Sequence, residues 1–261
     1  MKAKLLNRKL SFVIFAWLLI SRGALFLQAQ TTNGATDISR YPDDQSLLPG
    51  KGPVQTWTDF PKIWAQREAT WKMAAAADKG AVVFLGDSIT QFWKSLSNDF
   101  SGLHVANRGI SGDTTRGVLY RLPEVNDLSP EAIVLLIGTN DLGLGGDPAQ
   151  VAANIHDILL GLHKAHPKMP IIVCRVMPRN DRNLHLEEKI KQLNSLIDGL
   201  VKNDPSLIEC DTWTMYADAN GDPKKAEFKD LLHPTALGYA KWTAALKPIL
   251  AKLNLSAQTS Q

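Results

Sequence analysis

Two hydrophobic patterns alternate along the chain from about residue 57 onward. One is a short run of consecutive apolar residues, and the other is a longer segment in which apolar residues recur every three or four positions. Consecutive apolar residues indicate strands buried on both faces, whereas the second pattern is typical of amphipathic helices. The predicted strands lie in AVVFLGDS, LHVANRG, EAIVLLIGTND, IIVCRVMP and LIECDTW, and the predicted helices cover about residues 58–78, 113–127, 148–165, 184–202 and 234–252.

This alternation predicts an α/β fold. Strands that are buried on both faces require a parallel sheet with helices on each side. The sequence therefore predicts a three-layer αβα domain with a five-stranded parallel, flavodoxin-like sheet. In such sheets ligands bind beyond the carboxyl ends of the strands. Polar residues that directly follow the strands are therefore the candidates for a functional site.

The first 56 residues depart from the pattern. Four basic residues among the first nine precede an apolar run at residues 10–20, and small residues follow near Ala29. That order predicts a signal peptide over residues 1–29, cleaved near Ala29, and export to the periplasm or beyond the cell. The run is short for a hydrocarbon core of about 30 Å, but a retained membrane anchor stays the alternative. Residues 30–56 lack periodicity, which predicts a linker before a domain at residues 57–255.

The net charge of +3 comes from the N-terminal segment. Five of the 29 Lys and Arg residues, and none of the 26 acidic residues, lie in residues 1–29, which leaves 24 basic against 26 acidic residues. The remainder has no basic cluster, so the composition excludes a nucleic-acid partner. Cys174 and Cys210 both lie in predicted strands, where buried free thiols are expected. Two cysteines do not predict a disulfide framework, and a bridge between them stays open.

Four polar clusters lie at the predicted strand ends or just before the last helix. GDS, with Ser88, follows the first strand, and NRGISGDTT, with Gly109, follows the second. GTND, with Asn140, follows the third strand, and DLLHP, with Asp230 and His233, precedes the last helix. A Gly-Asp-Ser tripeptide alone arises by chance in roughly one chain in twenty of this length, and an Asp-x-x-His segment in roughly one in three, so either alone is a weak signal. Their order and their shared position beyond the strand ends predict one site.

Ser88 is the predicted nucleophile of this site. A serine hydroxyl is nearly unreactive at neutral pH and needs a base within hydrogen-bond reach. His233 is the candidate base, and Asp230 can accept the other imidazole N–H and hold the required tautomer. Acyl transfer also needs donors aimed at the oxyanion. The candidates are the backbone N–H groups of Ser88 and Gly109 and the side-chain amide of Asn140.

The sequence predicts neither a metal site nor a cofactor. DANGDPKKAEFK begins like a calcium-binding loop at Asp218. Pro223, however, stands where that loop requires glycine, and Lys229 stands where it requires a bidentate acid. A polar turn is therefore the interpretation of this segment. The predicted serine chemistry needs no cofactor, since the nucleophile, the base and the oxyanion donors all come from the chain.

The four clusters resemble the four blocks of the SGNH, or GDSL, hydrolase family, over about residues 80–252. Within that family, NRGISGDTTRGVLYRL and LLIGTND are most similar to the catalytic subunits of intracellular platelet-activating factor acetylhydrolase and their bacterial relatives. Asp141 departs from those subunits, which have a second asparagine at this position. The resemblance implies an SGNH hydrolase fold, a catalytic role for Ser88, Asp230 and His233, and an oxyanion hole formed by Ser88, Gly109 and Asn140.

The resemblance also bears on substrate size and assembly. In the acetylhydrolases, bulky apolar residues beside the nucleophile and before the histidine restrict the acyl pocket. Ile89 and Leu232 occupy those positions here, which implies a short acyl group such as acetyl. The acetylhydrolase subunits pair, so the resemblance implies a homodimer as well.

Together these observations predict an exported serine esterase, a carboxylic ester hydrolase acting on short-chain esters of a carbohydrate or lipid-like molecule. Acyl transfer to a sugar would use the same residues and stays an alternative. A carbohydrate-binding module on a former hydrolase scaffold is the alternative from another class. The predicted partners are a small-molecule or carbohydrate ester, and a membrane only where the N-terminal segment is uncleaved.

Overall fold

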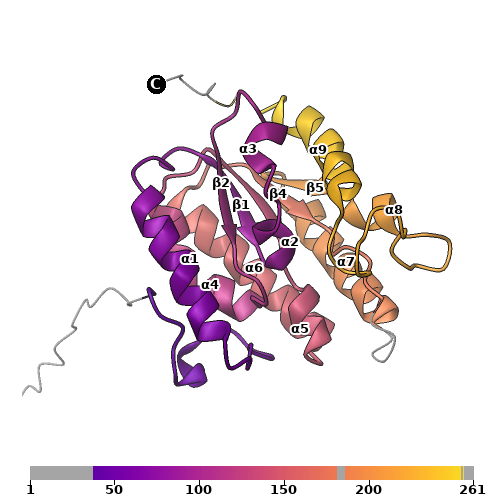
Figure 1. Cartoon of the computed structure of the whole chain (residues 1–261), viewed down its shortest axis with the longest axis horizontal. Coiled ribbons are helices and arrows are strands. Elements are labelled where there is room, and N and C mark those ends of the chain that lie inside the picture. The colour runs from indigo at the N-terminus through magenta and orange to yellow at the C-terminus, as the bar shows by residue number, and fades with distance from the viewer. Residues whose placement is uncertain (1–37, 181–185, 254, 256–261) are drawn as a thin grey trace, which may run out of the picture. The chain divides into compact units, whose positions relative to one another are not determined.

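The computed structural model describes residues 38–180, 186–253 and 255. Its centre is a 5-stranded sheet in which all neighbouring strands are parallel (Figure 1). The strand order is β2-β1-β3-β4-β5, and the strands are β1 (Val82–Gly86), β2 (Val105–Gly109), β3 (Ala132–Leu136), β4 (Ile171–Cys174) and β5 (Leu207–Cys210). From β1 the chain first adds β2 on one side and then adds β3, β4 and β5 on the other, so the strand order reverses between β1 and β3, as in flavodoxin-like sheets. The predicted fold class is confirmed.

Helices cover both faces of the sheet, and each face has its own hydrophobic cluster (Figure 1). One face packs against α4 (Thr115–Asp127), α6 (Pro148–Ala165) and α7 (Glu187–Asn203), and the other against α2 (Ser88–Gln91), α3 (Leu96–Asp99) and α9 (Ala236–Leu250). Side chains alternate along a strand, so Val83 of β1 joins the first cluster and Phe84 joins the second. All residues of β1 are buried, as its consecutive apolar residues predict. Two short helices, α5 (Thr139–Gly143) and α8 (Thr212–Tyr216), follow β3 and β5.

The predicted helices agree with the observed ones to within a few residues. The last helix, predicted from residue 234, begins instead at Ala236 and is capped by Thr235 Oγ1, which accepts a hydrogen bond from the Gly238 N–H at 3.3 Å. Pro234 pairs with Phe228 in an antiparallel bridge and therefore precedes the helix. The predicted signal peptide, residues 1–29, lies outside the described residues.

The segment before α1 (Phe60–Ala74) is packed against the domain. A short 3-10 helix, η1 (Gln45–Leu47), lies within it. Tyr41 and Leu48 are buried in a third hydrophobic cluster with Trp64 of α1. Arg116 of α4 donates hydrogen bonds to backbone carbonyls of this segment. Residues 38–56 therefore differ from the linker that their lack of periodicity predicts, because their few apolar side chains pack against residues distant in the sequence.

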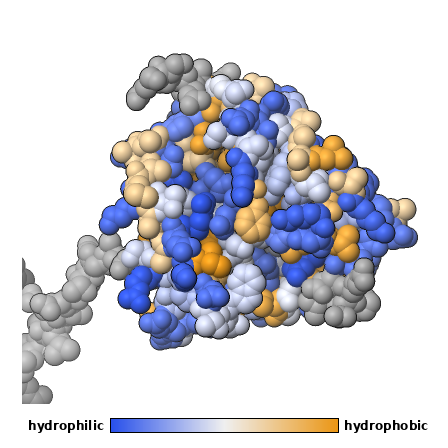
Figure 2. Space-filling view, in the orientation of Figure 1, coloured by the Kyte–Doolittle hydropathy of each residue, from blue (hydrophilic) through white to orange (hydrophobic). Residues whose placement is uncertain are grey.

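The surface of the described domain is polar over much of its area. The face seen in Figure 2 is mostly hydrophilic, with apolar residues scattered between charged ones. Such a distribution is ordinary, because more than half of a protein's accessible surface comes from apolar atoms. No helix within the described ranges is long and apolar enough to cross a membrane.

Cys174 and Cys210 lie opposite each other in the register of β4 and β5. Both thiols are free and buried. Burial, reinforced by the neighbouring Cys210, raises the pKa of the Cys174 thiol well above its ordinary range. A thiol that stays protonated is a poor nucleophile, so Cys174 is an inert core residue, as its position in an apolar run predicts.

Candidate active site

Ser88 lies directly after β1, at the carboxyl edge of the sheet. It is the first residue of α2, which Asp87 caps by accepting a hydrogen bond from the Ile89 N–H at 2.9 Å. A side chain at Gly86 would clash with the Leu136 carbonyl and with Thr90. Glycine is therefore required for β1 to turn into α2 beside β3. The tight turn leaves Ser88 only 4% exposed.

His233 lies in a loop, residues 227–235, that folds back on itself before α9. Phe228 and Pro234 form the antiparallel bridge, and the Lys229 N–H donates to the His233 carbonyl at 3.0 Å. Phe228 is 3% exposed and so anchors the loop in the core. This anchoring brings the loop to the carboxyl end of β1, where Ser88 lies.

Asp230 and His233 share one tight turn within this loop. Asp230 Oδ1 accepts hydrogen bonds from the backbone N–H groups of Leu232, at 3.2 Å, and His233, at 2.7 Å. Leu231 between them has a φ of 62°, in the left-handed region that leucine rarely adopts. The Leu231 carbonyl in turn accepts a hydrogen bond from the Asn180 N–H at 3.1 Å. The turn places both functional side chains on one side of a short segment.

The three predicted catalytic side chains form one chain of hydrogen bonds. His233 Nε2 lies 2.9 Å from Ser88 Oγ, and His233 Nδ1 lies 2.8 Å from Asp230 Oδ2. An ionised carboxylate only accepts hydrogen bonds, so Nδ1 carries the proton of the neutral imidazole. Nε2 can then accept the proton of the Ser88 hydroxyl, which is what a general base requires.

The environment of Asp230 favours its ionised form. Partial burial alone would raise the pKa of Asp230, but hydrogen bonds from the backbone and imidazole of His233 outweigh it and hold the pKa below the ordinary 3.8. The Asp230 side chain is 48% exposed and that of His233 is 17% exposed. Because the pKa is lowered, this interaction stabilises the fold above the ordinary value and is lost as the pH falls through the lowered value.

Asn140 lies in the loop that follows β3, and its neighbour Asp141 fixes that loop. Asp141 is fully buried and accepts hydrogen bonds from the Thr115 N–H, at 3.0 Å, and from the Thr115 hydroxyl. Asn140 Nδ2 donates to the Asp113 carbonyl at 2.9 Å. An amide nitrogen carries two hydrogens, so a second N–H is left for a substrate oxygen.

Gly109 does not present a free backbone N–H in this structure. Its N–H donates to Oδ1 of Asn107 at 3.0 Å. A side chain at Gly109 would clash with the backbone of Gln91 and Asp87, so glycine is required where α2 crosses the end of β2. Close packing therefore explains this glycine, and its predicted role as an oxyanion donor is not supported by its hydrogen bonding.

Gly112, in the same loop, has the property that was expected of Gly109. Its backbone N–H has no hydrogen-bond partner within the described ranges, and its φ is 85°. Its carbonyl accepts a hydrogen bond from Gln55 Nε2 at 3.1 Å, and the next residue, Asp113, binds the Asn140 amide. A backbone N–H without a partner therefore lies one residue before the carbonyl that binds the Asn140 amide. Its position just before a helix start predicts a structural turn, which is why the sequence alone did not single it out.

The two residues predicted to line an acyl pocket differ in exposure. Leu232, adjacent to His233 in the chain, is partly exposed. Ile89 is 1% exposed and packs in the core cluster with Phe84 and Trp93. Both residues belong to the same hydrophobic cluster, Ile89 inside it and Leu232 packed against it from a partly exposed position.

Phe92 lies beside the His233 ring, a contact that the sequence patterns did not reveal. The two ring centroids are 5.3 Å apart, and the planes are inclined at 53°. Phe92 follows Ser88 by one helical turn, and its N–H donates to the Ser88 carbonyl at 2.9 Å. That spacing of four positions was the available signal, because residues at i and i+4 share a helix face. Lys229 Nζ also lies over the Phe92 ring, 5.3 Å from its centroid.

Asp87, next to the candidate nucleophile, is a fully buried acid. Burial is the largest influence on its pKa, the hydrogen bond from the Ile89 N–H opposes it, and nearby Asp113 and Asp141 add to it. Together they raise the pKa of Asp87 to about 7. Its Oδ2 has no hydrogen-bond partner within the described ranges. Folding therefore favours the protonated form of Asp87.

We expect Asp87→Asn to stabilise the fold more at pH 8 than at pH 5. The folded pKa of Asp87 lies above the ordinary 3.8, so its contribution to stability is present at low pH and is lost as the pH rises through about 7. The amide keeps an oxygen for the Ile89 N–H but never ionises. The difference between the two pH values is at most about 3 kcal/mol, since only the interval from pH 5 to about 7 contributes and one pKa unit corresponds to about 1.36 kcal/mol. Urea unfolding at both pH values measures it, and an equal effect at the two would contradict this assignment.

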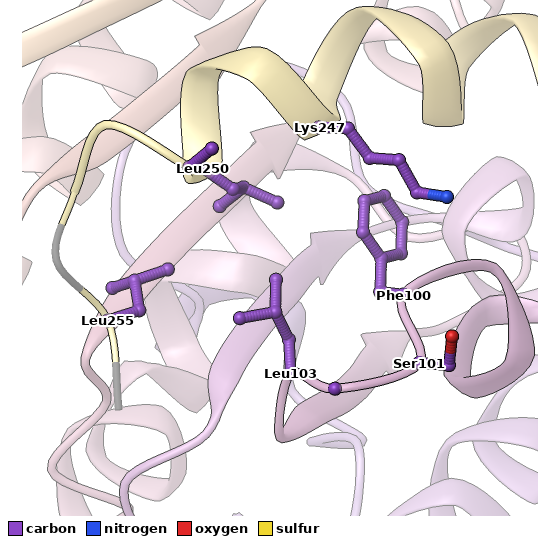
Figure 3. Close-up of a pocket in the computed structure, with 8 residues that line it drawn as sticks. Phe100, Ser101, Leu103, Lys247, Leu250 and Leu255 are labelled. Carbon is purple, nitrogen blue, oxygen red and sulfur yellow. The ribbon is translucent and has the colours of Figure 1, made fainter. Parts of the chain in front are cut away.

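A cleft elsewhere in the domain lacks the groups of a catalytic site. It lies between the loop that precedes β2 and the end of α9, and Phe100, Leu103, Leu250 and Leu255 line it, with Lys247 at its edge (Figure 3). Residues that precede β2 lie at the amino edge of a parallel sheet, opposite to the edge where Ser88 lies. The cleft is therefore separate from the hydrogen-bonded side chains described above.

Comparisons with known proteins identify the family and the fold of this chain. The GDSL-like Lipase/Acylhydrolase family matches residues 84–241. The platelet-activating factor acetylhydrolase IB subunit alpha1 of Homo sapiens is 32% identical over 180 residues, which are 66% of this chain and 76% of that protein. A GDSL-like lipase from Bacteroides thetaiotaomicron has a solved structure that is 26% identical, covers 70% of this chain and 97% of its own, and superimposes with a TM-score of 0.63. The family 3 carbohydrate esterase of Clostridium thermocellum shares the fold, with a TM-score of 0.52, 21% identity, and coverage of 67% of this chain and 98% of that one. The chain belongs to the GDSL-like lipase/acylhydrolase family.

Proposed function

We propose that the protein is an exported serine esterase that hydrolyses short-chain esters, acetyl esters above all, of a carbohydrate or lipid-like molecule. The observation that carries this proposal is the hydrogen-bonded chain from Ser88 Oγ through the His233 imidazole to Asp230 Oδ2, with distances of 2.9 and 2.8 Å. The family, and relatives named as acetylhydrolases, support the ester and the acetyl group.

In the first step Ser88 Oγ attacks the ester carbonyl carbon while His233 Nε2 takes the hydroxyl proton. The carbonyl π electrons move to its oxygen, which becomes an oxyanion. The donors that we assign to it are the Ser88 N–H, the Gly112 N–H and the second N–H of Asn140 Nδ2. Asp230 stabilises the imidazolium through Nδ1.

In the second step the imidazolium gives its proton to the alkoxy oxygen, the C–O bond breaks and the alcohol leaves. The acyl group stays on Ser88 as an ester. Water then attacks the acyl carbon, again with His233 taking the proton, and the acid is released as the Ser88 hydroxyl re-forms. The only groups required are a nucleophile, one base that alternates as an acid, and the oxyanion donors.

We expect Asn140→Ala to lower kcat about 10²–10³-fold, since this is the usual effect of removing one oxyanion donor. KM should change little, because the donor binds the oxyanion more strongly than the ground-state carbonyl. Steady-state kinetics on p-nitrophenyl acetate measure both constants. Asn98→Ala, at an exposed position of α3, is the matched control and should keep the wild-type kcat. A wild-type kcat in Asn140→Ala would remove Asn140 from the oxyanion hole.

A series of p-nitrophenyl acetate, butyrate and octanoate tests the proposed substrate. We expect kcat/KM to be highest for acetate, since Leu232, next to His233, is proposed to limit the space for the acyl group of the ester. Equal or faster hydrolysis of octanoate would contradict the short-chain assignment. Addition of a sugar acceptor and a search for acylated sugar distinguish hydrolysis from acyl transfer. Absence of both hydrolysis and fluorophosphonate labelling would favour a carbohydrate-binding module.

The proposal of export rests on the basic and apolar pattern of residues 1–29. Expression in a bacterial host, followed by fractionation and N-terminal sequencing, tests it. We expect the protein outside the cytoplasm to begin near Gln30. An intact N-terminus in the membrane fraction would favour the anchor instead.

A further inference from the structure

Helix α1, although it precedes the family match at residues 84–241, contributes Arg67 and Trp71 to a cluster of three arginines around one tryptophan ring. Trp71 of α1 is 2% exposed, and three guanidinium groups lie against its ring. Arg67, Arg108 and Arg121 have their guanidinium carbons 5.0, 5.2 and 5.2 Å from the Trp71 ring centroid, respectively. Contacts of this kind are favourable when the cation is desolvated.

Two of these arginines, Arg121 and Arg67, donate hydrogen bonds to backbone carbonyls at the ends of the strands near the candidate site. Arg121 Nη2 donates to the Gly86 carbonyl at 2.9 Å, two residues before Ser88, and Arg121 Nε binds Asp113 at 2.9 Å. Arg121 therefore binds the last residue of β1, the strand that Ser88 follows. The third arginine, Arg108, instead pairs with acidic groups of neighbouring segments.

Arg67 binds the end of β2. Its Nε donates to the Gly109 carbonyl at 2.8 Å, and its Nη2 donates to the carbonyl and to Oδ1 of Asn107, at 3.1 and 3.2 Å. The same Asn107 Oδ1 accepts the Gly109 N–H, and Asn107 Nδ2 donates to the Thr90 carbonyl at 2.6 Å. Thr90 lies in α2, two residues after Ser88. Arg67 thus fixes an asparagine that joins the end of β2 to the helix of the nucleophile.

We propose that Arg67 is a positioning residue for the proposed esterase reaction, acting through Asn107 on α2 and on the loop that carries Gly112. This inference rests on the proposed function for its kinetic part. A guanidinium is suited to the role because its planar fork reaches two carbonyl groups at once, which a lysine ammonium cannot do with the same geometry. Displacement of reacting groups by about 1 Å can lower a rate about 10²-fold, so a distant anchor of this kind matters for catalysis.

The test compares Arg67→Met, Arg67→Lys and Asn107→Ala with wild type. In the Arg67 variants we expect kcat on p-nitrophenyl acetate to fall about 10–100-fold with KM nearly unchanged. Arg67→Lys keeps a hydrogen-bond donor for one of the carbonyl groups but loses the planar fork, so it should recover part of the thermal stability but not kcat. Arg116→Lys is the matched control, since Arg116 also donates to backbone carbonyls but to those of Pro49 and Gly52. It should keep the wild-type kcat.

Two further measurements make the outcome decisive. Because Arg67 is proposed to act through Asn107, Arg67→Met combined with Asn107→Ala should lower kcat by much less than the product of the single effects. Amide hydrogen exchange, followed by mass spectrometry, should be faster at residues 107–112 in Arg67→Met and unchanged there in Arg116→Lys. Multiplicative kinetic effects, or a wild-type kcat with wild-type exchange, would overturn the inference. Wild-type protein that neither hydrolyses esters nor labels with fluorophosphonate would instead defeat the proposed function, and the exchange data would still decide the role of Arg67 in the loop.

Discussion

Replacement of Ser88 by alanine should abolish measurable ester hydrolysis. Without Oγ no acyl-enzyme forms, and His233 has no hydroxyl from which to take a proton. Removal of the nucleophile of a serine hydrolase lowers kcat by about 10⁴–10⁶-fold, and the remainder comes from the oxyanion donors and substrate binding. The kcat on p-nitrophenyl acetate measures the loss. Labelling of the intact protein by a fluorophosphonate, read as one mass increment, should disappear in the same variant.

The control for this change is Ser97→Ala, at an exposed position of α3. It removes the same atom from the surface and should keep both the hydrolysis and the label. Ser88→Ala removes a single oxygen atom and keeps the side-chain carbon, so the variant loses little packing and its melting temperature should stay close to that of wild type. Hydrolysis at the wild-type rate by a folded Ser88→Ala protein would contradict the nucleophile assignment and, with it, the proposed function.

The sheet and the relation of Ser88 to His233 were accessible from the sequence because both follow from short-range patterns. Consecutive apolar residues specify buried parallel strands, and parallel strands bring their carboxyl ends to one edge. A serine after the first strand and an Asp-x-x-His segment before the last helix then have one place to meet. The structure brings them together across 145 positions of the chain.

Other features depend on contacts that no short pattern encodes. The N–H of Gly109 is occupied because the side chain of Asn107 turns back to it, and side-chain direction is not readable from residue type. Ile89 follows Ser88 at a helix start, where a side chain can face either the core or the substrate, and it faces the core. Tyr41 and Leu48 are too sparse to form a period, yet both are buried by partners far along the chain.

The left-handed backbone conformation of Leu231 is likewise not predictable from the sequence. Leucine gives no sign of a φ of 62°, since this region is unfavourable for residues other than glycine by about 1–2 kcal/mol. The conformation is held by Asp230 Oδ1, which binds two backbone N–H groups, and by the Asn180 N–H, which binds the Leu231 carbonyl. Asp230 therefore makes two kinds of hydrogen bond: Oδ1 binds the backbone of the turn, and Oδ2 binds the His233 imidazole.

That division of oxygens predicts the effect of Asp230→Asn. The variant has one oxygen in place of two. When this oxygen keeps its hydrogen bonds from the backbone N–H groups of Leu232 and His233, the new NH₂ group faces His233 Nδ1. Nδ1 must then accept a hydrogen bond from the NH₂ group, so the imidazole proton moves to Nε2. A protonated Nε2 cannot take the Ser88 proton, so kcat should fall about 10⁴-fold while KM changes little, as for the corresponding change in other triads.

The alternative orientation of the new amide would place NH₂ against two backbone N–H groups, which is unfavourable in the turn. Asp218→Asn separates these effects, because Asp218 Oδ1 also accepts two backbone N–H groups, at 2.8 and 3.0 Å, but is exposed in a loop without a histidine contact. It should keep the wild-type kcat with a similar small loss of stability. The imidazole N–H resonances of Asp230→Asn, followed by ¹⁵N NMR, should report the proton on Nε2. A wild-type kcat together with a proton still on Nδ1 would show that one oxygen suffices and that His233 is oriented by the backbone turn alone.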